Sequence, residues 1–105
     1  MRKQRIEKLL QMIAENEDDT FALYALGMEF EALTQFNLAV IYFNKVLKLE
    51  PDKVAVYYRL ATIMHATGND EKAISLLNKG LELLKISSDQ KTINEFKSLI
   101  DEISY

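Results

Sequence analysis

Residues 23–51 read LYALGMEFEALTQFNLAVIYFNKVLKLEP, and residues 57–85 read YYRLATIMHATGNDEKAISLLNKGLELLK. The two stretches align without a gap at an offset of 34 residues. The identical pairs are Tyr24/Tyr58, Leu26/Leu60, Ala32/Ala66, Ala39/Ala73, Asn44/Asn78, Lys45/Lys79, Leu47/Leu81 and Leu49/Leu83. Internal periods of about 20–50 residues are typical of solenoids, in which each unit buries its apolar side against its neighbours. Such a chain is expected to bind another molecule rather than to enclose a catalytic pocket.

The spacing of small and aromatic residues gives the phase of the repeat. The key positions of the first stretch are Leu23-x2-Leu26-Gly27-x2-Phe30, Ala39-x3-Phe43 and Pro51. This order resembles the tetratricopeptide repeat, whose pattern is W-x2-L-G-x2-Y, then A-x3-F and a final P. Leu23 replaces the usual tryptophan and Phe30 the usual tyrosine, and both replacements keep an apolar side chain.

The resemblance implies an all-α fold, a short right-handed α-solenoid of antiparallel helix pairs with about six helices. The whole chain, residues 1–105, is expected to form a single domain. Within it we expect an N-terminal half repeat at 1–19, a first repeat at 20–53, a second repeat at 54–87 and a C-terminal capping helix at 88–105. The second repeat is looser, because Ala61 replaces the glycine and Lys85 replaces the proline.

Hydrophobic periodicity and end signals predict the helices. The first is expected over residues 2–15, and later ones are expected to end near Leu33, Leu49 and Thr67, with a tight turn at residues 34–35. Pro51 should stop the third helix, and Gly68 should adopt the left-handed conformation. The expected N-terminal caps are Asp18 or Asp19, then Asp52, then Asn69 or Asp70, and finally Ser88 or Asp89.

Two glycines have packing interpretations. Gly27 is expected to permit the close approach of a neighbouring helix. Gly80 falls inside a predicted helix, where glycine costs about 1 kcal/mol relative to alanine. We therefore expect it to admit a bulky side chain from the last helix. That helix has one apolar side, formed by Ile93, Phe96, Leu99, Ile100 and Ile103.

Composition excludes several classes of function. A hydrophobic content of 49% provides for a packed core. The net charge of −3 argues against a general nucleic-acid binder. The chain has no cysteine, so disulfides and thiolate chemistry are excluded, and its longest apolar run is far too short to span a bilayer. No membrane association is expected, and a cytoplasmic location follows by default.

The sequence offers little catalytic chemistry. His65 is the single histidine, which leaves no histidine cluster for a metal. A catalytic His65 would need a positioned partner group, and the simpler interpretation is a partly exposed helical residue near a turn. The acids at residues 15–19 lack the spacing of a calcium loop. We therefore predict no enzyme, no catalytic residue, no cofactor and no metal.

In the family that the chain resembles, the first helix of each repeat lines a concave face that holds a peptide. The resemblance places a partner-binding groove on this side, extended from the last helix by Phe96 and Leu99. Its residues are Phe21, Tyr24, Met28 and Glu31 from the first repeat, and Tyr58, Arg59, Thr62 and His65 from the second. Aromatic and methionine side chains suit an adaptable surface. The alternative interpretation is that Tyr24 and Tyr58 simply pack between adjacent helices.

The kind of peptide is partly restricted. Family members that bind the C-terminal carboxylates of chaperones carry a lysine and an asparagine on this face, where this chain has Tyr24 and Met28. That carboxylate clamp is not expected here, and an apolar or mixed peptide is the better match. The basic residues Arg2, Lys3, Arg5 and Lys8 form either a solvated face or a small patch for an anionic partner.

A second surface is centred on Ile41 and Tyr42. Ile41 stands where similar repeats place a polar residue, and the run from Val40 to Phe43 is apolar throughout. Two interpretations remain open, a harmless exposed side chain and a self-complementary patch that forms a homodimer. The leading hypothesis is thus a non-catalytic adaptor or scaffold that binds an unknown protein. The alternative is a self-association module, and a small enzyme or nucleic-acid-binding regulator is disfavoured.

Overall fold

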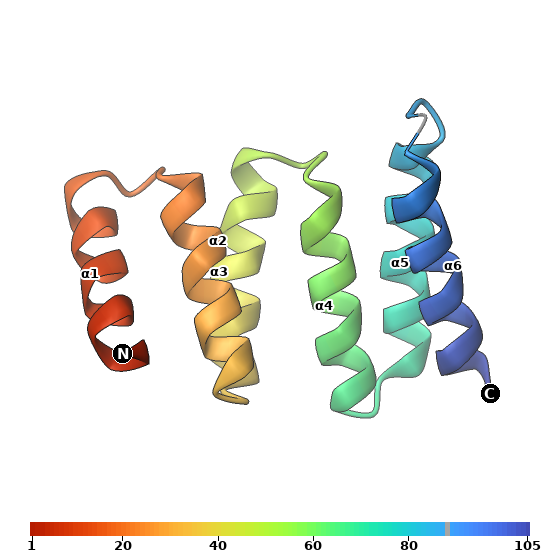
Figure 1. The fold of residues 1–105 in the computed structure, drawn as a ribbon, viewed down its shortest axis with the longest axis horizontal. Helices are drawn as coiled ribbons and strands as arrows, with labels where there is room; N and C mark the ends of the chain where they lie inside the picture. The colour runs from red at the N-terminus through yellow and green to blue at the C-terminus, as the bar shows by residue number, and fades with distance from the viewer. Residues whose placement is uncertain (88) are drawn as a thin grey trace. The chain divides into compact units, whose positions relative to one another are not determined.

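The computed structural model of the 105-residue chain describes every residue except 88. The described residues form six α-helices and contain no strand. The helices are α1 (Arg2–Glu15), α2 (Thr20–Ala32), α3 (Phe36–Leu49), α4 (Val54–Ala66), α5 (Asp70–Leu84) and α6 (Gln90–Ser104) (Figure 1). The predicted all-α class is confirmed. The described helices include none that is long and apolar enough to cross a membrane.

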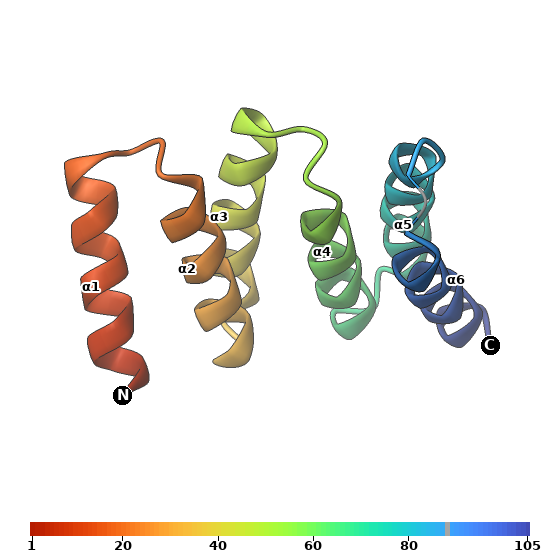
Figure 2. The same cartoon turned by 45° about the horizontal axis from the view of Figure 1, so that its top comes forward.

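The chain divides into two compact units, which are described separately. Unit 1 spans Met1–Pro51 and holds α1 to α3, and unit 2 spans Asp52–Tyr105 and holds α4 to α6. Within unit 1, α2 packs against both α1 and α3; within unit 2, α5 packs against both α4 and α6. Consecutive helices in each unit run antiparallel, as both views show (Figures 1 and 2). The exact repeat boundaries inside the units stay a prediction.

Side-chain caps start three of the helices. The carboxylate of Asp19 accepts a hydrogen bond from Ala22 N at 3.0 Å, and the Asn69 amide oxygen accepts one from Lys72 N at 3.2 Å. Asp89 caps α6 in the same way. These bonds satisfy backbone amides that have no partner within the first helical turn. The sequence therefore identified these three caps correctly, while the alternative cap at Ser88 lies outside the described residues.

The predicted cap at Asp52 is wrong. Pro51 and Asp52 form a turn, and Lys53 occupies the N-cap position of α4 without a side-chain capping bond. Because the helix begins at Val54, the Asp52 carboxylate lies one residue too early in the chain. Instead the backbone closes the turn, since Val56 N donates to the Lys53 carbonyl at 3.0 Å.

The core of unit 1 depends on a ring that lies against a glycine. Phe43 of α3 is completely buried. A Cβ atom on Gly27 of α2 would lie 2.6–2.8 Å from three atoms of its ring. Every side chain larger than hydrogen would therefore push the two helices apart. A second cluster joins α1 to α2 through Leu9, Ala22 and Leu26.

Unit 2 has the same kind of contact between a phenylalanine ring and a glycine, here between α6 and α5. Phe96 of α6 is 2% exposed and lies directly over Gly80 of α5, where three of its ring atoms would lie 3.2 Å or less from an added Cβ. The expected role of Gly80 is thus confirmed. The other buried apolar side chains of α5 and α6 are Ala73, Leu77, Leu84, Leu99 and Ile103.

Two turns 34 residues apart place different residues, Thr34 and Gly68, in the left-handed backbone region. Gly68 ends α4 with φ of 87°, as expected, and Thr34, which stands 34 residues earlier, has φ of 56°. A β-branched residue in this region is strained, whereas glycine is not. The Thr34 hydroxyl donates to the Leu33 carbonyl at 2.6 Å, which offsets part of that strain.

We expect Thr34→Gly to raise the free energy of unfolding by about 0.5–1 kcal/mol, because relief of the left-handed strain exceeds the added entropy of the unfolded chain. The reciprocal change Gly68→Thr should lower it by about 1–2 kcal/mol. Urea unfolding followed by circular dichroism measures both. Thr34→Asn is the control and should fall between wild type and Thr34→Gly. A Thr34→Gly protein no more stable than wild type would show that the hydroxyl bond fully offsets the strain.

The cap of α6 is also sensitive to pH. Thr92 Oγ1 donates to Asp89 Oδ2 at 2.7 Å, and Thr92 N donates to Asp89 Oδ1 at 3.1 Å. These bonds, the side-chain bond first, lower the pKa of Asp89 below its ordinary value of 3.8. A lowered folded-state pKa means that the cap stabilises α6 above pH 3.8 and loses that effect as the pH falls through the lowered pKa.

Removal of the Thr92 hydroxyl tests this cause. We expect Thr92→Val to raise the pKa of Asp89 toward 3.8, as measured by NMR titration of its carboxyl carbon. Thr92→Ser keeps the hydroxyl and should leave the pKa low. An unchanged pKa in Thr92→Val would mean that the hydroxyl is not the main cause.

Candidate protein-binding surface

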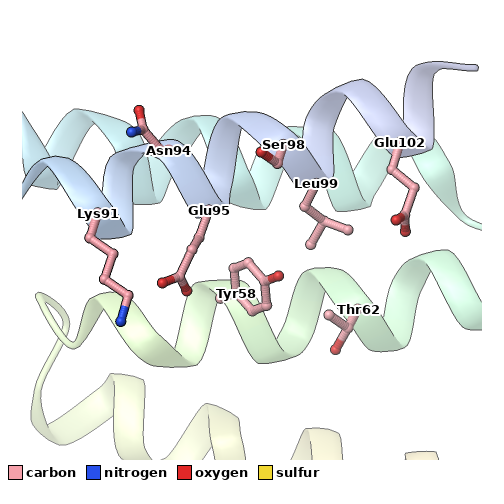
Figure 3. A pocket seen from close by; sticks show the side chains of 8 residues that line it. All are labelled: Tyr58, Thr62, Lys91, Asn94, Glu95, Ser98, Leu99 and Glu102. Carbon is pink, nitrogen blue, oxygen red and sulfur yellow. The ribbon is translucent and has the colours of Figure 1, made fainter.

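A groove of about 570 Å³ lies between α4 and α6 in unit 2. Its lining side chains come from both helices (Figure 3): Tyr58, Thr62, Lys91, Asn94, Glu95, Ser98, Leu99 and Glu102. The labelled residues run in the same direction along both helices, so α4 and α6 are parallel across the groove. The predicted groove residues Tyr58 and Thr62 both line it.

Tyr58 forms one wall of the groove. Its ring centroid lies 5.3 Å from that of Phe96, with the ring planes at 60°, and the side chain is half-buried. Thr62 follows one turn later, and its hydroxyl donates to the Arg59 carbonyl at 2.7 Å. The Tyr58 ring therefore has one supported face, which fixes its position beside the groove.

The last helix contributes differently from what the sequence suggested. Phe96 was expected to extend the groove, and this is wrong, because its ring is buried between Tyr58 and Gly80. Leu99 does line the groove, at 8% exposure. An apolar side chain thus lies at the base, with exposed polar side chains around it.

Three charged side chains of α6 project toward α4 (Figure 3). They are Lys91, Glu95 and Glu102, all exposed. In the part of the chain that the structure describes, the side-chain carboxylates of Glu95 and Glu102 form neither a hydrogen bond nor an ion pair. None of these three residues belongs to the apolar side of α6 that the sequence predicts. Their common side could have been found from their spacing, because residues 91, 95 and 102 lie on one side of a helix.

The remaining predicted residues of α4 are Arg59, next to Tyr58, and His65, near the C-terminal end of the helix. Arg59 is half-buried, and His65 is exposed. His65 Nδ1 lies 2.7 Å from Asp70 Oδ1, and this contact joins the end of α4 to the first turn of α5. Both side chains are well exposed, at 41% and 50%, so the contact has the setting of a surface link rather than of an enclosed catalytic pair. The described residues contain no cluster of candidate metal ligands.

The predicted row on α2 belongs to unit 1. Phe21 is 70% exposed, while Tyr24, Met28 and Glu31 are half-buried. The Tyr24 ring centroid lies 5.6 Å from that of Phe43, with the planes at 60°. One face of this tyrosine therefore packs on the core, as the packing interpretation predicts, while its side chain stays partly accessible.

The two predicted self-association residues have different environments. Ile41 is 49% exposed, and Leu38, one turn earlier on α3, is 39% exposed. Tyr42 instead stacks on Phe30 at 5.6 Å and 19°, with Lys45 Nζ 5.4 Å from its ring centroid. The exposed patch is thus Leu38 with Ile41, and Tyr42 belongs largely to the packing of unit 1.

The basic N-terminal face is partly engaged within unit 1. Arg2 Nη1 lies 3.1 Å from Glu29 Oε1 on α2. Arg5 lies in the same shallow depression, which Met1, Arg2 and Glu29 also line. Arg2 is thus engaged within unit 1, and the choice between a solvated face and a patch for an anionic partner stays a prediction.

Comparison with known proteins agrees with this geometry. The family model described as tetratricopeptide repeat matches residues 32–85, just over half of the chain. No curated protein sequence matches the chain. One similar solved structure is the solution structure of protein BPP2914 from Bordetella parapertussis, with 20% identity and a TM-score of 0.83. The match covers 94% of this chain and 86% of that one.

A second similar structure is the crystal structure of MamA, with 21% identity and a TM-score of 0.79. This match covers 83% of the present chain but only 51% of MamA, so the chain spans about half of that protein. At these identities the likeness concerns the fold. Together with the family match and the six-helix architecture, it shows that the chain belongs to the tetratricopeptide repeat family of protein-interaction modules.

Proposed function

We propose that this protein is a non-catalytic adaptor that binds a peptide segment of a partner protein on the side formed by the first helices of its repeats. The observation that carries the proposal is the groove between α4 and α6, with Tyr58 as a wall and Leu99 at its base. Its volume lies within the range of about 300–1,000 Å³ typical of ligand sites. An apolar base inside a polar rim is the usual anatomy of a protein interface.

The α2 row supports the same function from unit 1. Phe21 exposes 70% of its surface, which is unusual for a large aromatic side chain. Met28 lies two turns further along α2 and can adapt its shape to a partner. Aromatic anchors of this kind often provide most of the binding energy at interfaces. We therefore assign Phe21, Tyr24, Met28 and Glu31 to a second contact region for the partner.

We expect Ser98→Arg to reduce partner binding at least tenfold, because the added side chain fills the groove. Ser98 is exposed and lines the groove, so the substitution removes no core packing. The measurement is affinity capture from a lysate of the source organism with wild type and variant as baits, followed by mass spectrometry. Titration of the identified partner by calorimetry then gives the affinities.

Ser75→Arg is the matched control. Ser75 is exposed on α5 and lies outside the groove, so the same substitution there should preserve binding. Circular dichroism must show equal helix content in both variants. A partner that binds wild type and Ser98→Arg equally well would rule out this groove as the binding site.

A second candidate function is self-association through the α3 patch. It is favoured by the exposure of Ile41 and Leu38 on one side of the helix, at 49% and 39%. A two-fold contact would bury this patch against its copy. The chain could then act as a structural module with or without a further partner.

Light scattering tests the second function. We expect wild type to form a dimer at high micromolar concentration and Ile41→Glu to be monomeric, because a buried unpaired carboxylate strongly disfavours the contact. Ser75→Glu, which adds the same charge at an exposed position on α5, is the control and should still dimerise. A wild-type protein that stays monomeric at this concentration would exclude the contact.

A further inference from the structure

We propose that the segment bound between α4 and α6 is an amphipathic helix with two basic side chains seven residues apart and an apolar side chain between them. This inference rests on the proposed function of the same groove. It follows from the two carboxylates, Glu95 and Glu102, that flank the apolar base at Leu99. Both carboxylates are exposed on the side that faces α4 (Figure 3), and within the described structure both are unpaired.

The spacing of the carboxylates favours a helical occupant. Seven residues of α-helix rise about 10.5 Å, so Glu95 and Glu102 are separated by about this distance along α6. In an extended peptide, side chains return to the same side about every 6.7 Å, which gives spacings of about 6.7 and 13 Å. A helix places residues seven apart on nearly the same side at about 10.5 Å. Two basic residues of a helix can therefore meet both carboxylates while an apolar residue between them contacts Leu99 and Tyr58.

The helix dipoles and Lys91 give the segment a direction. The helices α4 and α6 run parallel, so both N-termini lie toward the Lys91 end and both C-termini toward the Glu102 end. A bound helix is favoured when its own N-terminus meets the two negative C-terminal ends. The segment would then run antiparallel to α6, with its residues opposing Glu102, Leu99, Glu95 and Lys91 in that order.

This direction specifies a sequence pattern. The separations along α6 are three residues from Glu102 to Leu99, then four to Glu95 and four to Lys91. The complementary pattern is a basic residue, two others, an apolar residue, three others, a second basic residue, three others and an acid. The acid at the end of this pattern would pair with Lys91, and Lys91 disfavours a basic residue of the segment at the same place.

A second copy of the chain fits the groove less well than a separate partner. On α5, Lys72, Leu76 and Lys79 provide basic, apolar and basic residues over seven positions. Leu76, however, is partly buried within its own unit, and Lys79 Nζ lies 5.9 Å from the Tyr57 ring centroid. Leu76 and Lys79 are therefore already engaged within their own unit, whereas a separate helix would offer side chains that are not. We therefore assign the groove to a partner segment.

Fluorescence anisotropy with synthetic helical peptides tests the proposal. The basic probe is an alanine- and glutamine-based peptide that carries lysine, leucine, lysine and glutamate in the stated pattern. The acidic probe has glutamate at both lysine positions. A third probe moves one lysine by two residues, which turns it away from the shared side of the helix.

We expect wild type to bind the basic probe at least tenfold more tightly than the acidic or shifted probe. The variant Glu95→Lys/Glu102→Lys should reverse the preference and bind the acidic probe more tightly. Asp52→Lys/Asp101→Lys changes the net charge equally at exposed positions outside the groove, and it should keep the wild-type preference. High salt should reduce the difference, since these charges are exposed.

Each alternative result contradicts the proposal in a recognisable way. Equal binding of all probes, or a preference that the control variant also reverses, would show that the two carboxylates do not select the partner. Oligomers of wild type that disappear in Glu95→Lys/Glu102→Lys would identify a second copy as the occupant. If Ser98→Arg abolishes capture of the natural partner while Glu95→Lys/Glu102→Lys does not, the groove function stands and the basic helix is wrong.

Discussion

The contact between a phenylalanine ring and a glycine determines how closely the helices of each unit approach. Phe43 lies against Gly27 in unit 1, and Phe96 lies against Gly80 in unit 2. In both places a methyl group would already overlap the ring, so the glycines set the distance between the helices. Glycine at position 80 costs about 1 kcal/mol of helix stability relative to alanine. The burial of the Phe96 ring outweighs this cost.

These two rings also position the two tyrosines of the repeat. Tyr24 lies at 5.6 Å from Phe43 and Tyr58 at 5.3 Å from Phe96, and both pairs are tilted by 60°. The supporting phenylalanine comes from α3 in unit 1 and from α6 in unit 2, so different elements create the same environment. A tyrosine that is fixed on one face loses little further freedom when a partner covers the other. In our proposal, each tyrosine therefore packs on the core with one face and offers the other to the partner.

Local signals in the sequence were enough for the helices and most of their ends. Asp19, Asn69 and Asp89 were each predicted as one of two adjacent candidates for the cap, because capping depends on a few consecutive residues. Asp52 failed because the turn after Pro51 uses one residue more than expected, and end positions are the least certain part of such predictions. The left-handed Thr34 was missed as well, since the composition of the turn predicts a tight bend but no specific backbone conformation.

The candidate site was predictable only in part, for a different reason. The resemblance to tetratricopeptide repeats predicted Tyr58 and Thr62 as groove residues, and both line the groove between α4 and α6. It could not place Phe96, because the apolar side of the last helix is wide and periodicity alone does not rank its members by depth. The charged members of the groove were also missed. A polar residue on a terminal helix has the same pattern whether it faces open water or a neighbouring helix, and that distinction requires the tertiary structure.

The last helix combines two tasks that are usually treated as separate. Its apolar side, with Phe96 and Ile103, covers α5 and completes the core of unit 2. Its polar side, with Glu95 and Glu102, borders the groove. Different positions of α6 serve the two tasks. Substitutions at its buried positions should therefore change the stability of unit 2. In our proposal, substitutions at its groove positions should change the choice of partner. The exposed charges of α6 can therefore change without disturbing the aromatic contact beneath them.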